Sequence, residues 1–304
     1  MSGLAVCTLA HGRADHLANL VRGLSASRLL PELLVVSVLQ PEPYELPPTP
    51  FPVRQLAFGE RGLSLAEGRN AAAAAARAVA DKLIFLDVDC IPHPDLTADY
   101  YAALDERRGV MMGEVAYLPK GATDDGIDVD RFDAIGVRHS ERRGPPDGLA
   151  EQCSDHRCFW SLNFAMRFED WQASGGFDER YRGYGGEDTD FGRQCAARGL
   201  PLWWVRGARV WHQYHPHHMP PVHHLDSVLA NAAVFAEKWG EPTMQHWLRA
   251  FVLMGLARRE GDRWVKLRDP AEADLALTRQ QADQPYASSA TVLERLEAEA
   301  MAAA

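Results

Sequence analysis

The stretch that decides the fold is residues 83–89, Leu-Ile-Phe-Leu-Asp-Val-Asp, in which an apolar run ends in two acids one residue apart. Such a run is typical of a strand buried on both faces of a sheet. Ligands of open α/β sheets bind beyond the carboxyl ends of the strands, where Asp87 and Asp89 are expected. Alternation along an extended chain predicts both carboxylates on one side and Val88 on the other.

Two carboxylates at one point repel each other, and a divalent cation relieves that repulsion. Oxygen ligands that also face a diphosphate suit Mn²⁺ or Mg²⁺. The alternative is a solvated turn, because Asp-x-Asp by itself is a weak signal. The same tripeptide recurs at residues 128–130 with no apolar strand before it, and we interpret that copy as solvated surface.

The residues before this stretch alternate buried strands with helical segments. We expect strands at 4–9, 33–39, 53–58 and 83–86, with helices near 17–24 and 63–80. This order predicts an α/β fold with a mostly parallel sheet and helices on both faces.

Beyond residue 92 the order becomes irregular. We expect strands at 110–118, 159–166, 202–205 and 209–212, helices at 168–174 and 187–198, and a polar excursion over 119–157. The part from residue 225 is helical in composition, with Val228, Leu229, Ala232 and Phe235 on one face. The sequence thus predicts a catalytic domain over 1–216, with halves of about 1–92 and 93–216, and a helical extension over 217–304.

The composition disfavours some classes of binding partner. A net charge of −10 disfavours non-specific binding to nucleic acid or to anionic membranes. The chain has no apolar run of about 18 residues and no basic leader, so neither a transmembrane segment nor a signal peptide is expected. Its five cysteines fit reduced thiols and a cytoplasmic location.

A glycine-rich segment forms a second constellation, with Gly175–Asp178 followed by Tyr184-Gly-Gly-Glu-Asp188. Glycines let the backbone approach a ligand closely, and Tyr184 offers an aromatic face to a sugar ring. Glu187 and Asp188 open a helix, where carboxylates are stabilised by the dipole. Helix capping is therefore one interpretation; in the other, one acid takes the proton of an acceptor hydroxyl and its neighbour orients the acceptor.

Basic and histidine side chains supply further candidates. His212 ends a predicted strand and suits a third metal ligand, whereas the histidines between 215 and 224 are too dense for all to bind one ion. Arg13 follows the first strand and Arg69-Asn70 begins the alanine-rich helix, so both arginines are candidates to meet uracil or phosphate.

These residues resemble a known family. The run Phe85-Leu-Asp-Val-Asp-Cys-Ile-Pro92, followed by Gly175-Gly-Phe-Asp-Glu-Arg-Tyr-Arg-Gly-Tyr-Gly-Gly-Glu-Asp188, resembles family-2-like glycosyltransferases of the GT-A fold. It is most similar to the β-1,4-galactosyltransferase branch and its N-acetylgalactosaminyltransferase relatives. Arg13-Ala-Asp-His-Leu17 is similar to an N-terminal motif of that branch, and the resemblance covers roughly residues 4–216.

The resemblance implies a role for each matching residue. Asp89 and His212 would bind Mn²⁺, with Asp87 on the metal or the donor ribose. Asp188 would be the catalytic base and Glu187 would contact the acceptor. The donor candidates are Thr8, Arg13, Arg69, Asn70, Asp87 and Gly186, and the acceptor candidates are Tyr184, Glu187 and Trp160. Tyr184 replaces the more usual Trp, and residues 38–40 lack the Asp that many family-2 enzymes place against uracil.

The function we predict is that of a metal-dependent inverting glycosyltransferase. It would move a hexose, of the galactose type, from a UDP-sugar to a hydroxyl of a carbohydrate, lipid-linked or other acceptor. The alternatives are a retaining GT-A transferase, a sugar nucleotidyltransferase and an inactive nucleotide-sugar binding protein. A nucleotidyltransferase needs a basic, glycine-rich phosphate loop, which residues 10–13 do not provide.

Overall fold

The chain divides into two compact units in the computed structural model. The described residues are 3–59, 64–139, 142–280 and 289–303. The first unit comprises Met1–Glu179 and Asp188–Tyr214, and the second comprises Arg180–Glu187 and His215–Ala304. The short segment 180–187 thus groups with the C-terminal part of the chain, and not with its immediate neighbours in sequence.

The main sheet of the first unit has eight strands in the order β3-β2-β1-β4-β10-β6-β11-β9. Their bounds are β1 (Leu4–Ala10), β2 (Leu33–Val38), β3 (Val53–Ala57), β4 (Lys82–Leu86), β6 (Val110–Met112), β9 (Ala150–Cys153), β10 (Asn163–Arg167) and β11 (Leu202–Val205). Strands β3, β2, β1 and β4 are parallel, whereas β10 and β9 run antiparallel to their neighbours. The result is the mixed, mostly parallel α/β sheet that the sequence predicts.

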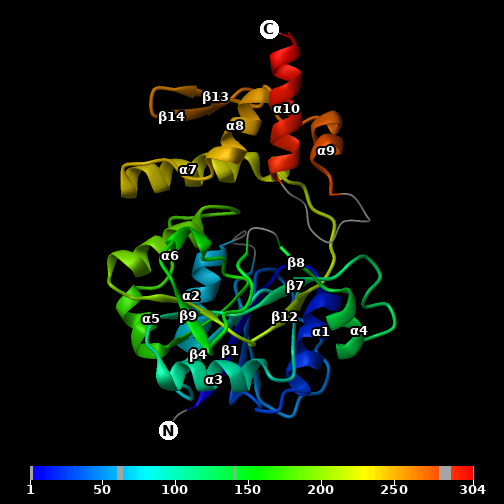
Figure 1. Cartoon of the computed structure of the whole chain (residues 1–304), viewed down its shortest axis with the longest axis vertical. Helices are drawn as coiled ribbons and strands as arrows, with labels where there is room; N and C mark the ends of the chain where they lie inside the picture. Colours follow the sequence, from blue (N-terminus) through cyan, green and yellow to red (C-terminus); the bar gives the residue numbers. More distant parts are fainter. Residues whose placement is uncertain (1–2, 60–63, 140–141, 281–288, 304) are drawn as a thin grey trace. The chain divides into compact units, whose positions relative to one another are not determined.

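Helices flank this sheet (Figure 1). They are α1 (Ala14–Ser25), α2 (Leu65–Ala76), α3 (Leu96–Glu106), α5 (Phe168–Ser174) and α6 (Glu187–Ala197). Helix α2 packs on β1 and β2 through small buried side chains such as Ala72 and Ala73, which allow a close approach. The same apolar cluster joins Phe85 of β4 to Trp171 of α5 and Phe191 of α6.

A second, four-stranded sheet lies in the same unit, in the order β5-β12-β7-β8. Its strands are β5 (Cys90–Pro92), β12 (Val210–His212), β7 (Val115–Tyr117) and β8 (Val137–Arg138), with helix α4 (Val129–Ile135) nearby in sequence. Trp211 is fully buried in a cluster with Ile91 and Phe132. This sheet places His212 directly opposite Cys90.

Two predicted strands differ from the structure. The strand expected at 110–118 is divided at Gly113, with β6 in the main sheet and β7 in the second. A Cβ atom at Gly113 would lie 2.2 Å from the carbonyl oxygen of Ala208 and 2.6 Å from the Tyr100 hydroxyl, so the chain crosses between sheets where no side chain fits. The strand expected at 159–166 begins only at Asn163, because a turn precedes it.

The second unit is built on its own apolar cluster. Its elements are α7 (Leu225–Trp239), α8 (Gln245–Leu253), α9 (Glu272–Thr278), α10 (Ser289–Ala303) and a hairpin of β13 (Ala257–Glu260) and β14 (Arg263–Lys266). Short 3-10 turns are η1 (His156–Cys158) in the first unit and η2 (Val222–His224) in the second. Val228, Leu229, Ala232 and Phe235 are buried as predicted, whereas the hairpin has no counterpart in the prediction.

Segment 180–187 joins this second unit through Asn231. The Asn231 side-chain amide donates to the carbonyl oxygens of Arg182 and Gly185, at 2.9 and 2.8 Å. The side-chain oxygen of Asn231 accepts from the amide of Arg182 at 3.2 Å. These contacts join residues that are far apart in sequence, so the local sequence pattern does not predict them.

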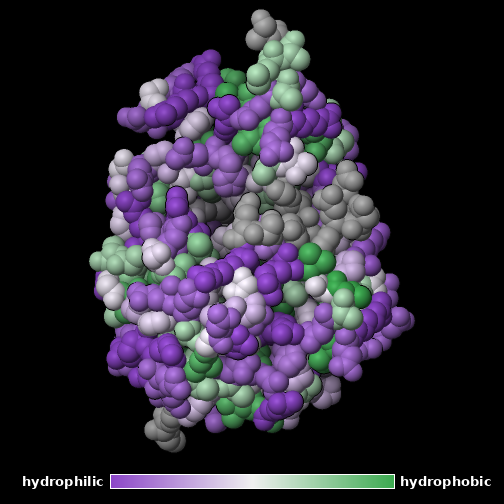
Figure 2. All heavy atoms as spheres, viewed as in Figure 1, coloured by the Kyte–Doolittle hydropathy of each residue, from purple (hydrophilic) through white to green (hydrophobic). Residues whose placement is uncertain are grey.

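The surface in view in Figure 2 is mainly polar. Figure 2 shows hydrophilic residues over most of the face in view, with hydrophobic residues scattered between them. Within the described ranges, no helix has both the length and the apolar character needed to cross a membrane.

Candidate active site

The site begins with a turn at the end of β4. The amide of Cys90 donates to the carbonyl oxygen of Asp87 at 2.9 Å, so residues 87–90 form a tight turn. The prediction that Asp87 and Asp89 share one side of an extended chain is therefore wrong, because the chain reverses between them. The turn still brings both acids to the carboxyl end of β4, and Asp89 is only 5% exposed.

Asp89 and His212 converge at this point, as the sequence predicts. Pairing of β12 with β5 sets the register, and His212 Nε2 lies 3.4 Å from Asp89 Oδ1. The ring of Tyr117 packs on His212, with 4.7 Å between centroids. The guanidinium of Arg13 forms an ion pair with Asp89 Oδ2. A buried carboxylate and an imidazole nitrogen thus face one another at the ends of two strands.

Asp87 lies in an acidic environment. Burial raises the pKa of Asp87 to about 6, an effect that nearby Arg69 opposes and that Asp89 and Asp188 reinforce. Arg69 donates to Asp87 Oδ1 at 3.1 Å. Arg69 and Arg13 are the positive charges paired with Asp87 and Asp89, and a divalent cation would add to them.

Asp188 contributes the third carboxylate. Its Oδ2 accepts from the amide of Ser161 at 3.2 Å. Its Oδ1 is buried and has no hydrogen-bond partner within the described residues. The contact with Ser161 spans 27 positions of sequence. The side chain is thus fixed by one oxygen while the other stays available to accept a proton.

The second Asp-x-Asp tripeptide has the structural role that its context predicts. Asp128 is the N-cap of α4, and its side chain accepts from the amide of Arg131 at 3.0 Å. Asp128 and Asp130 are both exposed. This copy is solvated surface.

The donor candidates are placed as follows. Arg13 and Arg69 pair with the acids of the site, as described above. Thr8 lies on β1, 4% exposed, and its hydroxyl has no partner within the described chain. Asn70 is engaged with the backbone of Phe177: its side chain both donates to the carbonyl oxygen and accepts from the amide, each at 2.9 Å. The structure thus gives Asn70 a role in holding the glycine-rich loop.

Replacement of Asn70 with alanine is expected to lower the free energy of unfolding by about 1–3 kcal/mol, because two hydrogen bonds to Phe177 are lost and buried backbone groups are left unpaired. Urea denaturation of the full chain measures this change. If the alanine variant keeps its stability but binds a nucleotide sugar more weakly, Asn70 contacts the donor and does not stabilise the loop.

The remaining candidates are divided between the units. Tyr184, Gly186 and Glu187 belong to the second unit. There the ring of Tyr184 stacks on those of His224 and Trp247, with centroids 4.8 and 6.0 Å apart. Gly186 has φ of 87°, a conformation that favours glycine. Glu187 is the first residue of α6 and is 8% exposed.

Trp160 belongs to the first unit. Its neighbours His139 and Arg142 were not among the residues that the sequence analysis selected. Its ring lies edge-on to His139, with 5.0 Å between centroids, and the guanidinium of Arg142 sits 5.3 Å from its centre. Arg142 and His139 come from the segment that we interpreted as a polar excursion. No local pattern marks them, because their burial comes from packing against distant strands.

One segment of the chain is similar to known glycosyltransferases in sequence. Residues 153–219, which include the glycine-rich loop, Asp188 and His212, match a family model described as the N-terminal domain of galactosyltransferase. A Validoxylamine A glucosyltransferase of Streptomyces hygroscopicus subsp. jinggangensis (strain 5008) is 34% identical over 80 residues, which cover 26% of this chain and 18% of that protein. Its counterpart from Streptomyces hygroscopicus subsp. limoneus is also 34% identical over 80 residues, covering 26% and 17%.

Solved structures share the fold. GalNAc-T7, crystallised with UDP, GalNAc and Mn²⁺, superposes with a TM-score of 0.54 at 15% identity, over 83% of this chain and 51% of that one. TarS of S. aureus gives a TM-score of 0.50 at 13% identity, over 83% and 43%. The match therefore spans less than a fifth of the length of the curated relatives, and the chain spans about half or less of these structures.

The chain has the fold of the GT-A glycosyltransferases. Together with the matched segment, this fold confirms the resemblance to the galactosyltransferase-like branch of that class.

Proposed function

We propose that this chain is a metal-dependent, inverting glycosyltransferase that moves a galactose-type hexose from a UDP-sugar to a hydroxyl acceptor. One observation carries the proposal. Asp89 and His212 converge within 3.4 Å at the strand ends, and the charges of Asp188 and Asp89 both act on Asp87. We infer that these three acids and the imidazole, which come from the turn after β4, the end of β12 and the start of α6, form a site for a cation and a polyanionic donor.

The residues present fit a divalent cation. Asp89, His212 and Asp87 offer carboxylate oxygens and an imidazole nitrogen, a set that suits Mn²⁺. Burial is the largest cause of the raised pKa of Asp87, and the nearby acids Asp89 and Asp188 add to it. When bound, a divalent ion would stabilise the charge that develops on the departing diphosphate.

Arginines would complete the donor site. In the structure Arg13 compensates the charge of Asp89. Once a cation takes over that compensation, the Arg13 side chain, which is 38% exposed, would be released to reach a donor phosphate. Arg69 would stay on Asp87 and hold its orientation, because Arg69 is itself buried. Thr8, with its unpartnered buried hydroxyl, is our candidate for a contact to the donor nucleoside.

The acceptor step would rest on Asp188. Its free Oδ1 would take the proton of the acceptor hydroxyl as that oxygen forms a bond to the anomeric carbon. The bond from the anomeric carbon to the diphosphate breaks, and the nucleoside diphosphate leaves with the electron pair. The amide of Ser161 holds Oδ2 and so fixes the direction in which Oδ1 points. Glu187, Tyr184 and Trp160 are our candidates for acceptor contacts.

A panel of nucleotide sugars tests this function. We expect UDP release from one UDP-hexose with Mn²⁺, and loss of that release in excess chelator, because the acids would repel the diphosphate without the ion. With a transferable acceptor, proton NMR of the new glycoside should show the opposite anomeric configuration to that of the donor. Full turnover in chelator would exclude the metal, and retained configuration would exclude the inverting mechanism.

A further inference from the structure

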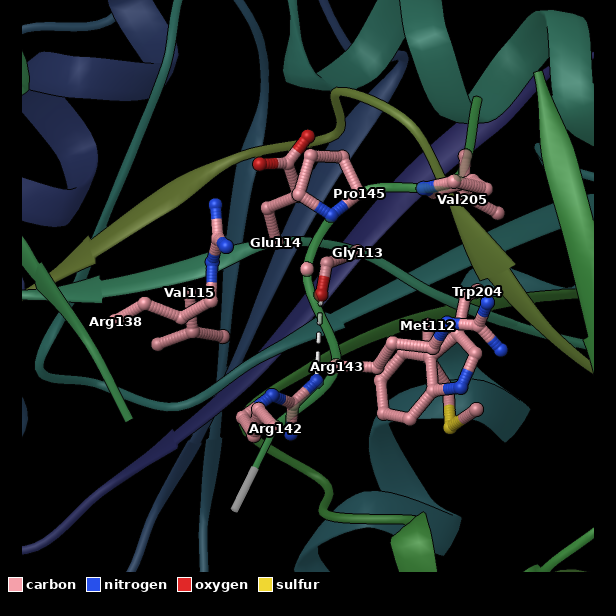
Figure 3. A pocket seen from close by; sticks show the side chains of 12 residues that line it. Met112, Gly113, Glu114, Val115, Arg138, Arg142, Arg143, Pro145, Trp204 and Val205 are labelled. Carbon is pink, nitrogen blue, oxygen red and sulfur yellow. Dashed lines mark hydrogen bonds between the residues drawn. The ribbon is translucent and has the colours of Figure 1, made fainter. Parts of the chain in front are cut away.

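A hollow in the acceptor half of the first unit holds three arginines. The space of about 270 Å³ around it includes open solvent, and the enclosed part has room for about one water molecule. Figure 3 shows Arg138, Arg142 and Arg143 around it, with Glu114 and Trp204 also in the lining. The hollow is formed where the chain crosses from β6 to β7 and where residues 142–146 lie beside the end of β11.

Arg142 is the buried member of this group. It is 6% exposed, and its Nη2 donates to the carbonyl oxygen of Gly113 at 3.3 Å. Its guanidinium lies over the rings of Trp160 and Trp204, 5.3 Å from each centroid. Its Nη1 is buried and has no hydrogen-bond partner within the described residues. No ion pair of the described chain includes Arg142, so its charge has no carboxylate to balance it.

The neighbouring charges do not supply the missing partner. Arg143 is paired with Glu151 at 2.6 Å. Glu114, the acid in the lining, accepts from the amide of Gly207 at 2.8 Å and forms no described ion pair with Arg142. A buried guanidinium without a counter-ion is costly, since buried charges are normally paired. The ring faces of Trp160 and Trp204 stabilise this charge in part, and a bound anion would stabilise it further.

We propose that the Arg142 hollow is a subsite for an anionic group of the acceptor, a carboxylate or a phosphate, and this proposal rests on the proposed function. The planar fork of arginine is suited to both groups. Arg138 is exposed, and the side chain of Arg143 is 56% exposed. Both can turn aside at the rim, so that one terminal group enters while the sugar stays outside.

The position of the hollow connects it to the proposed chemistry. The ring of Trp160 that covers Arg142 belongs to the residue before Ser161, whose amide holds Asp188. An acceptor anchored on Arg142 would therefore lie beside the segment that orients the base. Arg142 would then select anionic acceptors, and donor hydrolysis would not depend on it.

The first test uses the full chain without donor or metal, with inorganic phosphate and acetate as probes at constant ionic strength. At about five times its Kd, an anion that binds only the folded state should raise Tm by about 2–4 °C. Arg142→Met, which matches the length of the side chain without its charge, should abolish the rise. Arg157→Met is the control, because Arg157 is exposed, pairs with Asp155 and lies outside the lining. If neither anion stabilises the parent protein, the proposal is overturned, whatever the folding of the variants.

The second test compares acceptors once a donor is found. Arg142→Met, with Arg142→Lys as a second variant, should raise KM about tenfold or more for a uronic acid or a sugar phosphate. KM for the neutral parent sugar should stay within about twofold, because one charge-assisted contact is lost only by the anions. The anionic acceptor whose KM rises in the Arg142 variants shows whether the natural group is a carboxylate or a phosphate. Equal losses for neutral and anionic acceptors would show a purely structural Arg142, whereas absence of donor hydrolysis in the parent would count against the proposed function alone.

Discussion

Asp188→Asn is expected to lower kcat by about 10²–10⁴-fold while leaving affinity for the UDP-sugar and Mn²⁺ within a few-fold. Asparagine has the size of aspartate, and its oxygen can still accept from the amide of Ser161, as Asp188 Oδ2 does at 3.2 Å. What it lacks is a basic oxygen at the place of Oδ1, which is buried and unpartnered in the described structure. Steady-state turnover, with donor binding measured separately, resolves the two effects.

The matched control for this variant is Asp128→Asn. Asp128 caps α4 and is exposed, so the same chemical change there removes a helix-capping charge away from the site. It should cost at most about 1 kcal/mol of stability and leave kcat unchanged. If Asp188→Asn behaves like Asp128→Asn, and kcat stays within a few-fold of the parent, Asp188 serves only the fold and the proposed base must be abandoned.

Asp89→Asn is expected to weaken Mn²⁺ binding at least about 10-fold, and to lower kcat/KM by about 10²–10³-fold at fixed metal concentration. The first effect follows from the loss of a ligand charge. The second corresponds to the several kcal/mol that a bound metal contributes to charge stabilisation in the transition state. Calorimetric titration with Mn²⁺ measures the affinity. His212→Gln should act in the same direction, because His212 Nε2 faces the same point at 3.4 Å from Asp89.

The chain provides its own control in the second copy of the tripeptide. Asp130→Asn makes the same substitution at the same position of an Asp-Val-Asp sequence, but Asp130 is exposed at the start of α4. It should change neither metal affinity nor turnover. Unaltered Mn²⁺ affinity in Asp89→Asn, with the fold intact by thermal unfolding, would show that the ion binds elsewhere or that no ion is needed.

Much of the fold could be predicted because buried runs and turn residues are local signals. The runs that become β1, β2 and β4 are mostly apolar, and a parallel sheet covered by helices buries such strands along their whole length. The strand-end positions of Asp89 and His212 were predictable, whereas their convergence depends on the antiparallel pairing of β12 with β5, which begins directly after Asp89. The different environments of Asp87–Asp89 and Asp128–Asp130 were predictable from the presence or absence of a preceding apolar strand.

The tertiary structure decided what depends on contacts between residues far apart in sequence. It divided the strand at 110–118, because Gly113 passes too close to Ala208 for any side chain. It grouped segment 180–187 with the C-terminal unit through Asn231, and engaged Asn70 with Phe177. It also buried Arg142, a residue whose polar neighbours in sequence predict exposure. Sequence periodicity reports which residues are buried along one element, whereas a side chain's partner depends on how separate elements are packed together.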